Sequence, residues 1–102
     1  MGSGYREKYY QRATEVVFKE SRIKFKSQLA VNLNFKNERI GKHFLDFLVE
    51  DKIILEIKKG NYFSKRNIEQ VYGYLQTINL KLAILANFTS TEVKFRRILN
   101  LY

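Results

Sequence analysis

Two apolar segments separated by three polar residues run from His43 to Gly60, and each segment carries a carboxylate in its interior. The stretch reads HFLDFLVEDKIILEIKKG, with Asp46 in the first apolar segment and Glu56 in the second. Short segments rich in Phe, Leu, Ile and Val on either side of a polar loop predict two antiparallel strands. A buried carboxylate is costly unless a cation or hydrogen-bond donors accompany it, so this pair constrains both the fold and its chemistry.

The length of the loop decides whether the two acids share a face of the sheet. A two-residue loop at Glu50 and Asp51 would put them on opposite faces. A three-residue loop that ends at Lys52 would instead place Asp46 opposite Glu56, with their Cβ atoms about 5 Å apart. Because no Asn-Gly or Asp-Gly pair favours the two-residue turn, we expect the three-residue loop.

The chemistry of such a pair follows from its charge. By the period of two, Lys58 emerges on the same face as Glu56. Two adjacent carboxylates in an apolar setting repel each other and lose hydration, so either a cation binds or one acid takes up a proton. Oxygen-only ligation suits Mg²⁺, with Mn²⁺ as an alternative, and a metal beside an ammonium group indicates metal-assisted phosphodiester hydrolysis. In the competing interpretation, both acids lie on a solvated face and neighbouring basic residues balance them.

The rest of the chain predicts two helices and three further strands. Helices are expected at residues 5–22 and 64–79, and strands at 23–35, 80–88 and 93–102, with a turn at 36–41. Apolar and polar residues alternate over 23–35, which predicts one buried and one solvent-facing side along the whole strand. A strand, a helix and a second buried strand in succession indicate a βαβ unit with parallel pairing. The prediction is an α/β fold of order α-β-β-β-α-β-β, with a mixed sheet flanked by helices.

Length and composition limit the class of protein. We expect residues 1–102 to form one domain, and the first three residues resemble an added leader. The chain has no cysteine, which excludes disulfides and thiolate metal sites. It has neither an apolar run of roughly 20 residues nor a signal-peptide pattern, so we expect an intracellular protein outside the membrane. A formal net charge of +9 favours an anionic partner, nucleic acid above all, although acidic membranes or proteins would also attract it.

Four short motifs resemble those of the PD-(D/E)XK nuclease superfamily, and they follow one another along the chain in the family's order. The D-x9-ExK spacing from Asp46 to Lys58 resembles its D…(D/E)xK signature, and GYREKYY resembles the GxxExxY motif that names one branch. QVYGY is similar to the QxxxY element of RecB-like nucleases, and LAILANF before a basic segment is similar to the end of the GxxExxY branch. The resemblance covers Gly4 to about Ile98 and implies a restriction-endonuclease-like core.

The resemblance also implies roles for the central motif. Asp46, Glu56 and the backbone carbonyl of Ile57 would bind Mg²⁺, and Lys58 would serve the attacking water. These are the roles of the matching motif positions in the family.

Further roles are implied on the two helices. Glu7 would lean toward the metal site, although an acid in a first helical turn is also favoured by the helix dipole alone. Gln70 would orient a water or a phosphate, and Tyr74 would either pack or contact nucleic acid. The candidate phosphate contacts are Lys36, Arg39, Lys42, Lys59, Lys65, Arg66, Lys94, Arg96 and Arg97.

The leading hypothesis is a Mg²⁺-dependent phosphodiesterase that cleaves DNA. The alternative is a catalytically inactive module of the same fold that binds nucleic acid or mediates assembly. A third hypothesis is an engineered small version of the fold. Against the pattern of the branch, we expect the chain to begin at the GxxExxY helix without an upstream helix, and a homodimer would supply the missing cover. We expect a structural or DNA-contacting role for the single histidine, His43.

Overall fold

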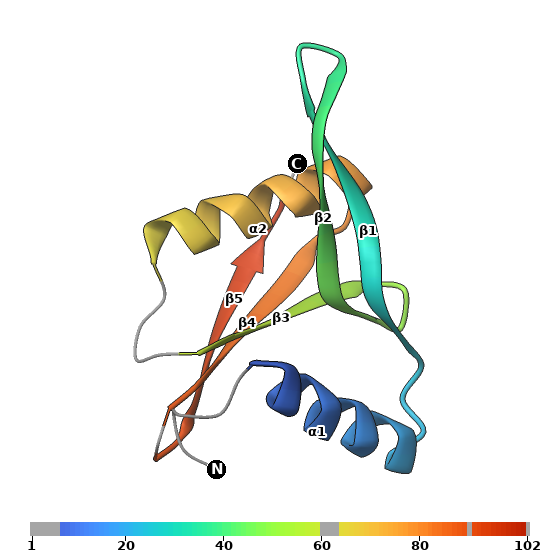
Figure 1. Cartoon of the computed structure of the whole chain (residues 1–102), viewed down its shortest axis with the longest axis vertical. Helices are drawn as coiled ribbons and strands as arrows, with labels where there is room; N and C mark the ends of the chain where they lie inside the picture. Colours follow the sequence, from blue (N-terminus) through green and yellow to red (C-terminus); the bar gives the residue numbers. More distant parts are fainter. Residues whose placement is uncertain (1–6, 60–63, 90, 102) are drawn as a thin grey trace.

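The computed structural model describes residues 7–59, 64–89 and 91–101 and shows a mixed five-stranded sheet with two helices (Figure 1). The elements are α1 (Glu7–Glu20), β1 (Phe25–Phe35), β2 (Glu38–Val49), β3 (Ile53–Lys59), α2 (Lys65–Ile78), β4 (Leu82–Phe88) and β5 (Val93–Leu99). The predicted fold class and element order are confirmed. None of the helices in the described ranges is long and apolar enough to cross a membrane.

The five strands lie side by side in the order of the sequence. β3 and β4 are parallel and every other neighbouring pair is antiparallel. The parallel pair requires a crossover, which α2 provides. Ser64 caps this helix by accepting a hydrogen bond from the N–H of Asn67 at 3.0 Å, and Asn79 ends it in the left-handed conformation. The predicted βαβ unit is therefore present.

Each helix covers a different face of the sheet and builds its own core. On the α2 side, Tyr74 and Leu75 pack against strand residues such as Ile54 and Leu85. On the α1 side, Tyr10 packs with strand residues that are almost fully buried, and its ring stacks on that of Phe88 at 4.3 Å. The sheet therefore lies between two apolar layers, so a polar group in its middle is largely removed from water.

The prediction that β1 buries one side along its whole length is wrong. Phe25 packs in the α1-side core, whereas Leu29, Val31 and Leu33 pack on the α2 side. The change of side occurs at Gln28, whose backbone φ of 53° is left-handed. A residue in this conformation interrupts the extended alternation that the sequence pattern assumes.

β2 changes sides at the same level of the sheet. Its ladder with β1 keeps one register on either side of this point, with Ser27 opposite Phe47 and Leu29 opposite Leu45. Leu45 belongs to the α2-side core and Phe47 to the α1-side core. Asp46 therefore lies where β2 passes from one apolar layer to the other.

The turn predicted at residues 36–41 is shorter in the structure. Only Lys36 and Asn37 form it, with φ values of 49° and 68°, and residues from Glu38 onward belong to β2. Two consecutive residues with positive φ are typical of a two-residue type I′ hairpin, and Asn tolerates this conformation. The polar composition of 36–41 reflects solvent exposure rather than a longer turn.

We expect Gln28→Val to lower the free energy of unfolding by about 1–2 kcal/mol, because a β-branched side chain is strained at positive φ. Gln28→Asn should have a smaller effect, since Asn adopts this conformation more readily. Ala30→Val is the matched control on the same strand, at an exposed position without positive φ. Urea denaturation of the three variants checks this, and equal effects of the two valine substitutions would contradict it.

Candidate active site

The loop from Glu50 to Lys52 sets the register of β2 against β3. The paired residues are Phe47 with Leu55, Leu48 with Ile54 and Val49 with Ile53. The N–H of Lys52 closes the loop by donating to the carbonyl of Val49 at 3.0 Å. The expected three-residue loop is confirmed, and its register carries Asp46 and Glu56 to the same level. The ladder pairs end just before these two residues.

Side-chain hydrogen bonds replace the ladder at the two acids. The N–H of Ile57 donates to Asp46 Oδ2 at 2.8 Å, and the N–H of Asp46 donates to Glu56 Oε2 at 3.3 Å. Each carboxylate thus accepts a backbone hydrogen bond from the strand of the other. Both acids are buried, at 8% and 2% exposure, so the solvated-face interpretation does not hold.

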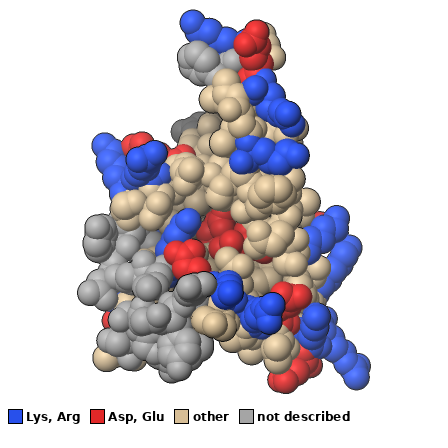
Figure 2. Space-filling model, in the orientation of Figure 1, with Lys and Arg blue, Asp and Glu red and all other residues tan. Residues whose placement is uncertain are grey.

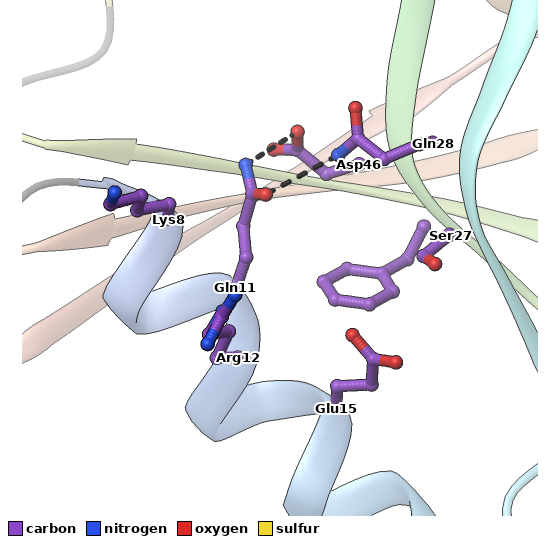
Figure 3. Close-up of a pocket in the computed structure, with 8 residues that line it drawn as sticks. Lys8, Gln11, Arg12, Glu15, Ser27, Gln28 and Asp46 are labelled. Carbon is purple, nitrogen blue, oxygen red and sulfur yellow. Dashed lines mark hydrogen bonds between the residues drawn. The ribbon is translucent and has the colours of Figure 1, made fainter.

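The outer oxygen of each carboxylate has its own partner. Gln11 of α1 donates from Nε2 to Asp46 Oδ1 at 2.8 Å, and Gln28 donates to Gln11 Oε1 at 3.3 Å (Figure 3). On the other side, His43 Nε2 lies 3.0 Å from Glu56 Oε1. Asp46, Glu56 and the side chains of Gln11, Gln28 and His43 therefore form one continuous network. It runs from the buried acids through half-buried Gln11 and His43 to the exposed Gln28.

Sequence reasoning missed Gln11 and Gln28. It expected a structural or DNA-contacting role for His43 but not its contact with Glu56. Gln11 lies four residues after Glu7, which the family resemblance singled out, so helical spacing from Glu7 could have pointed to Gln11 as well. His43 lies three residues before Asp46, and strand alternation would put the two on opposite faces. The change of side at Asp46 brings His43 to Glu56 instead, which no local pattern indicates.

Burial controls the protonation of the pair. It raises the pKa of Glu56 to about 9, the negative charge of Asp46 adds to this effect, and the ammonium group of Lys58 opposes it. Burial, and then the charge of Lys58, lower the pKa of His43, which favours the neutral imidazole. At neutral pH the metal-free pair therefore retains a proton on Glu56, as expected when two acids converge without a cation.

The helix α2 contributes Tyr74 beside Glu56 and His43, and Gln70 beside Tyr74. The ring of Tyr74 stacks on His43 with 4.5 Å between ring centroids, and Tyr74 is buried. Burial, and then the charge of Glu56, raise the pKa of Tyr74 to about 12, while the side chain of Gln70 acts in the opposite direction. Lys58 is half-buried, and its register partner on β4 is the buried Asn87, another polar neighbour that sequence reasoning missed.

An open pocket of about 340 Å³ reaches Asp46 from the α1 side. Its lining residues are Lys8, Gln11, Arg12, Glu15, Ser27, Gln28, Asp46 and Phe47 (Figure 3). Lys8 and Arg12 are exposed on α1, so two cations that the sequence did not single out border the entrance to the pocket at Asp46.

The other expected site residues are less closely grouped. Glu7 is half-buried at the start of α1, and Gly4 of the same motif lies outside the described residues. No set of three His, Cys, Asp or Glu side chains converges on a metal position within the described ranges. Exposed positions hold Lys65, Arg66, Gln70 and Arg96, and the side chain of Lys59 lies outside the described part. Their roles stay predictions.

The acid pair fits a hard divalent cation. Its donors are carboxylate oxygens, which Mg²⁺ and Mn²⁺ prefer. When both acids are ionised, a bound cation would offset the repulsion between them. With two side-chain ligands, most of the coordination sphere would be left to backbone oxygen, water and substrate.

We expect the stability of the metal-free protein to fall as the pH rises from 5 to 9. Glu56 has a pKa of about 9 in the fold against an ordinary value of 4.5, so the folded state binds a proton that the unfolded state releases. This contribution is complete below pH 4.5 and is lost as the pH approaches 9. Urea denaturation with chelator should therefore show a flatter pH dependence for Glu56→Gln. The exposed control Glu69→Gln should behave as wild type, and an unchanged slope in Glu56→Gln would contradict the assignment.

Comparison with known proteins assigns the sequence to a family. The family model of the PD-(D/E)XK nuclease superfamily matches residues 1–98. No curated protein sequence matches the chain. The crystal structure of SSO0001 is similar with a TM-score of 0.71 and 17% identity, over 91% of this chain and 49% of that chain, so this chain spans about half its length. At this identity the likeness shows the shared fold alone. The family match covers nearly the whole sequence, and the chain therefore belongs to the PD-(D/E)XK nuclease superfamily.

Proposed function

We propose that this protein is a metal-dependent nuclease that hydrolyses phosphodiester bonds of DNA at Asp46, Glu56 and Lys58. Membership of the superfamily supports a nuclease-type function. The observation that carries the proposal is the buried pair of acids, each hydrogen-bonded to the strand of the other. Lys58 is close enough for its charge to lower the pKa of Glu56. A protein gains little stability from such a pair, so a catalytic use explains it better than a structural one.

Asp46 and Glu56 are the residues that would hold Mg²⁺ or Mn²⁺, together with the backbone carbonyl of Ile57. When bound, such an ion supplies positive charge to the phosphate and lowers the pKa of a coordinated water. Glu56 must give up its proton to act as a ligand, so we expect binding to release a proton at neutral pH.

Other side chains of the protein orient the two acids, the attacking water and the phosphates. Gln11 and His43 hold the outer oxygens of the two carboxylates, so that the acids keep their positions without a ladder between the strands. Lys58 places a positive charge beside Glu56, where it can orient the attacking water and offset charge on the phosphate. The cations of Lys8 and Arg12 at the pocket entrance can receive the flanking phosphates.

We further assign the chain to the GxxExxY branch. Glu7 opens α1, Tyr10 of the same motif is buried in the α1-side core, and the QxxxY element lies on α2 with Tyr74 stacked on His43. Gln70 is exposed one turn before Tyr74, which suits contact with a water or a phosphate.

A second candidate is a catalytically inactive module that binds nucleic acid. It is favoured by the hydrogen bonds already present at all four oxygens of the acid pair and by the lack of a three-ligand group among the described residues. This candidate predicts salt-sensitive DNA binding without cleavage.

Incubation with supercoiled plasmid and Mg²⁺ or Mn²⁺ separates the two functions. We expect cleavage by the wild type and a loss of at least about 100-fold in Lys58→Ala and Asp46→Asn, because both remove groups placed at the reacting phosphate. Lys52→Ala, which removes the same charge from an exposed loop position, should cleave normally. Cleavage that survives in Lys58→Ala would contradict the mechanism, and binding without any cleavage would support the inactive module.

We expect Gln11→Leu to weaken Mn²⁺ binding by about 10-fold, because it removes the donor that orients Asp46. Calorimetric titration of the ion measures this without a substrate. Gln76→Leu, the same substitution at an exposed position of α2, is the matched control. An unchanged affinity in Gln11→Leu would show that Asp46 needs no orientation from α1.

A further inference from the structure

The outer part of the β1–β2 hairpin, residues 32–42, extends beyond both helices at one end of the molecule (Figure 1). We call this segment the outer hairpin. The molecule measures 42 Å along its longest axis, and the hairpin forms one end of that axis. Glu38, Arg39, Ile40 and Lys42 are exposed, whereas β2 is buried from Leu45 to Leu48. The outer hairpin is therefore presented to solvent and contributes little to either core.

A β-bulge turns an apolar side chain outward in the outer hairpin. Leu33 pairs with Gly41 and Asn34 pairs with Arg39, which leaves Ile40 as an extra residue on β2. A bulge bends the strand and re-aims its side chain. Ile40 is 69% exposed, and Phe44 further along β2 is 52% exposed. These apolar groups are placed on the surface rather than in the core.

The charge of the outer hairpin is positive. Lys36, Arg39 and Lys42 outnumber its one acid, Glu38. In Figure 2, Lys and Arg side chains lie on the protruding end and also on the lower part of the same face. Acidic side chains lie between these two groups. Cations interspersed with exposed apolar and amide side chains on a two-stranded ribbon fit a groove of a polyanion better than another protein core.

We propose that the outer hairpin binds duplex DNA to one side of the acid pair, an inference that rests on the proposed function. The major groove of B-DNA admits a two-stranded β-ribbon, in which cations contact phosphates and apolar side chains contact base edges. Glu38 and Asp46 lie on the same strand, β2, with the bulge at Ile40 between them, so a single element joins the outer hairpin to the site.

The reach of the hairpin sets the position of the contact. Eight residues separate Glu38 from Asp46 along β2, which corresponds to about 26 Å at 3.3 Å per residue. At 3.4 Å per base pair this distance corresponds to about 8 base pairs. The outer hairpin therefore contacts the duplex up to about 8 base pairs from the scissile bond, on one side only.

Removing two cations from the outer hairpin tests the contact. The double variant Arg39→Ala/Lys42→Ala is compared with Lys52→Ala/Lys81→Ala, which loses the same charge at exposed positions beyond the other end of β2 and before β4. Binding of a 30-base-pair duplex is measured in chelator over a range of salt concentrations, with thermal unfolding as the check of folding. We expect the hairpin variant to bind at least about 10-fold more weakly and its salt slope to fall by about 2, and the control to change far less.

Cross-linking locates the contact without depending on affinity. The chain has no cysteine, so Ile40→Cys can carry a single photoactivatable group, with Lys52→Cys as the control. On a duplex in which the cleavage position has been mapped, we expect cross-links from residue 40 within about 8 base pairs of that position, on one side.

The outcomes separate this inference from the proposed function. Equal losses in the two double variants, cross-links spread evenly along the duplex, or hairpin-dependent binding of single-stranded DNA or duplex RNA in preference to duplex DNA would each overturn the outer-hairpin proposal, even if the protein cleaves DNA. If the wild type never cleaves but the hairpin variant alone loses duplex binding, the nuclease proposal fails and the contact stands.

Discussion

The reciprocal hydrogen bonds between Asp46 and Glu56 and the backbones of each other's strands are the contacts on which the site depends. They hold β2 and β3 together just beyond the last ladder pair. These side-chain hydrogen bonds replace the backbone hydrogen bonds between β2 and β3, so the two carboxylates point into the space between the strands rather than away from the sheet. Two acids this close and this buried cannot both be ionised without a cation, so the raised pKa of Glu56 keeps a proton on the pair at neutral pH.

Both layers of the fold contribute to the support of this pair. Gln11 reaches Asp46 from α1, and Tyr74 of α2 stacks on His43, which contacts Glu56. A hydrogen-bond network can hold two acids this firmly only if the surrounding side chains are themselves fixed by packing. The α2-side core therefore does more than stabilise the sheet, because it holds Tyr74, on which His43 stacks.

The spacing of the sequence was sufficient to find the centre of the site but not its surroundings. Asp46, Glu56 and Lys58 lie on two adjacent strands joined by a short loop, so strand period and loop length relate their positions directly. Gln11 is 35 residues from Asp46 in the sequence. His43 reaches Glu56 only because β2 changes sides at Asp46. Contacts of this kind depend on how elements pack, which a local pattern does not encode.

The sequence by itself determined the order of helices and strands, the parallel crossover and the three-residue loop, because each follows from periodicity and turn chemistry over a few residues. Only the tertiary structure decided which apolar layer each side chain enters. Alternation indicates that a residue is buried but not under which helix. β1 changes sides at the left-handed backbone of Gln28, and because this residue is not a glycine, the sequence does not indicate the change. With apolar layers on both faces, the chain can change sides without exposing apolar surface, and that freedom places Asp46 between the two cores.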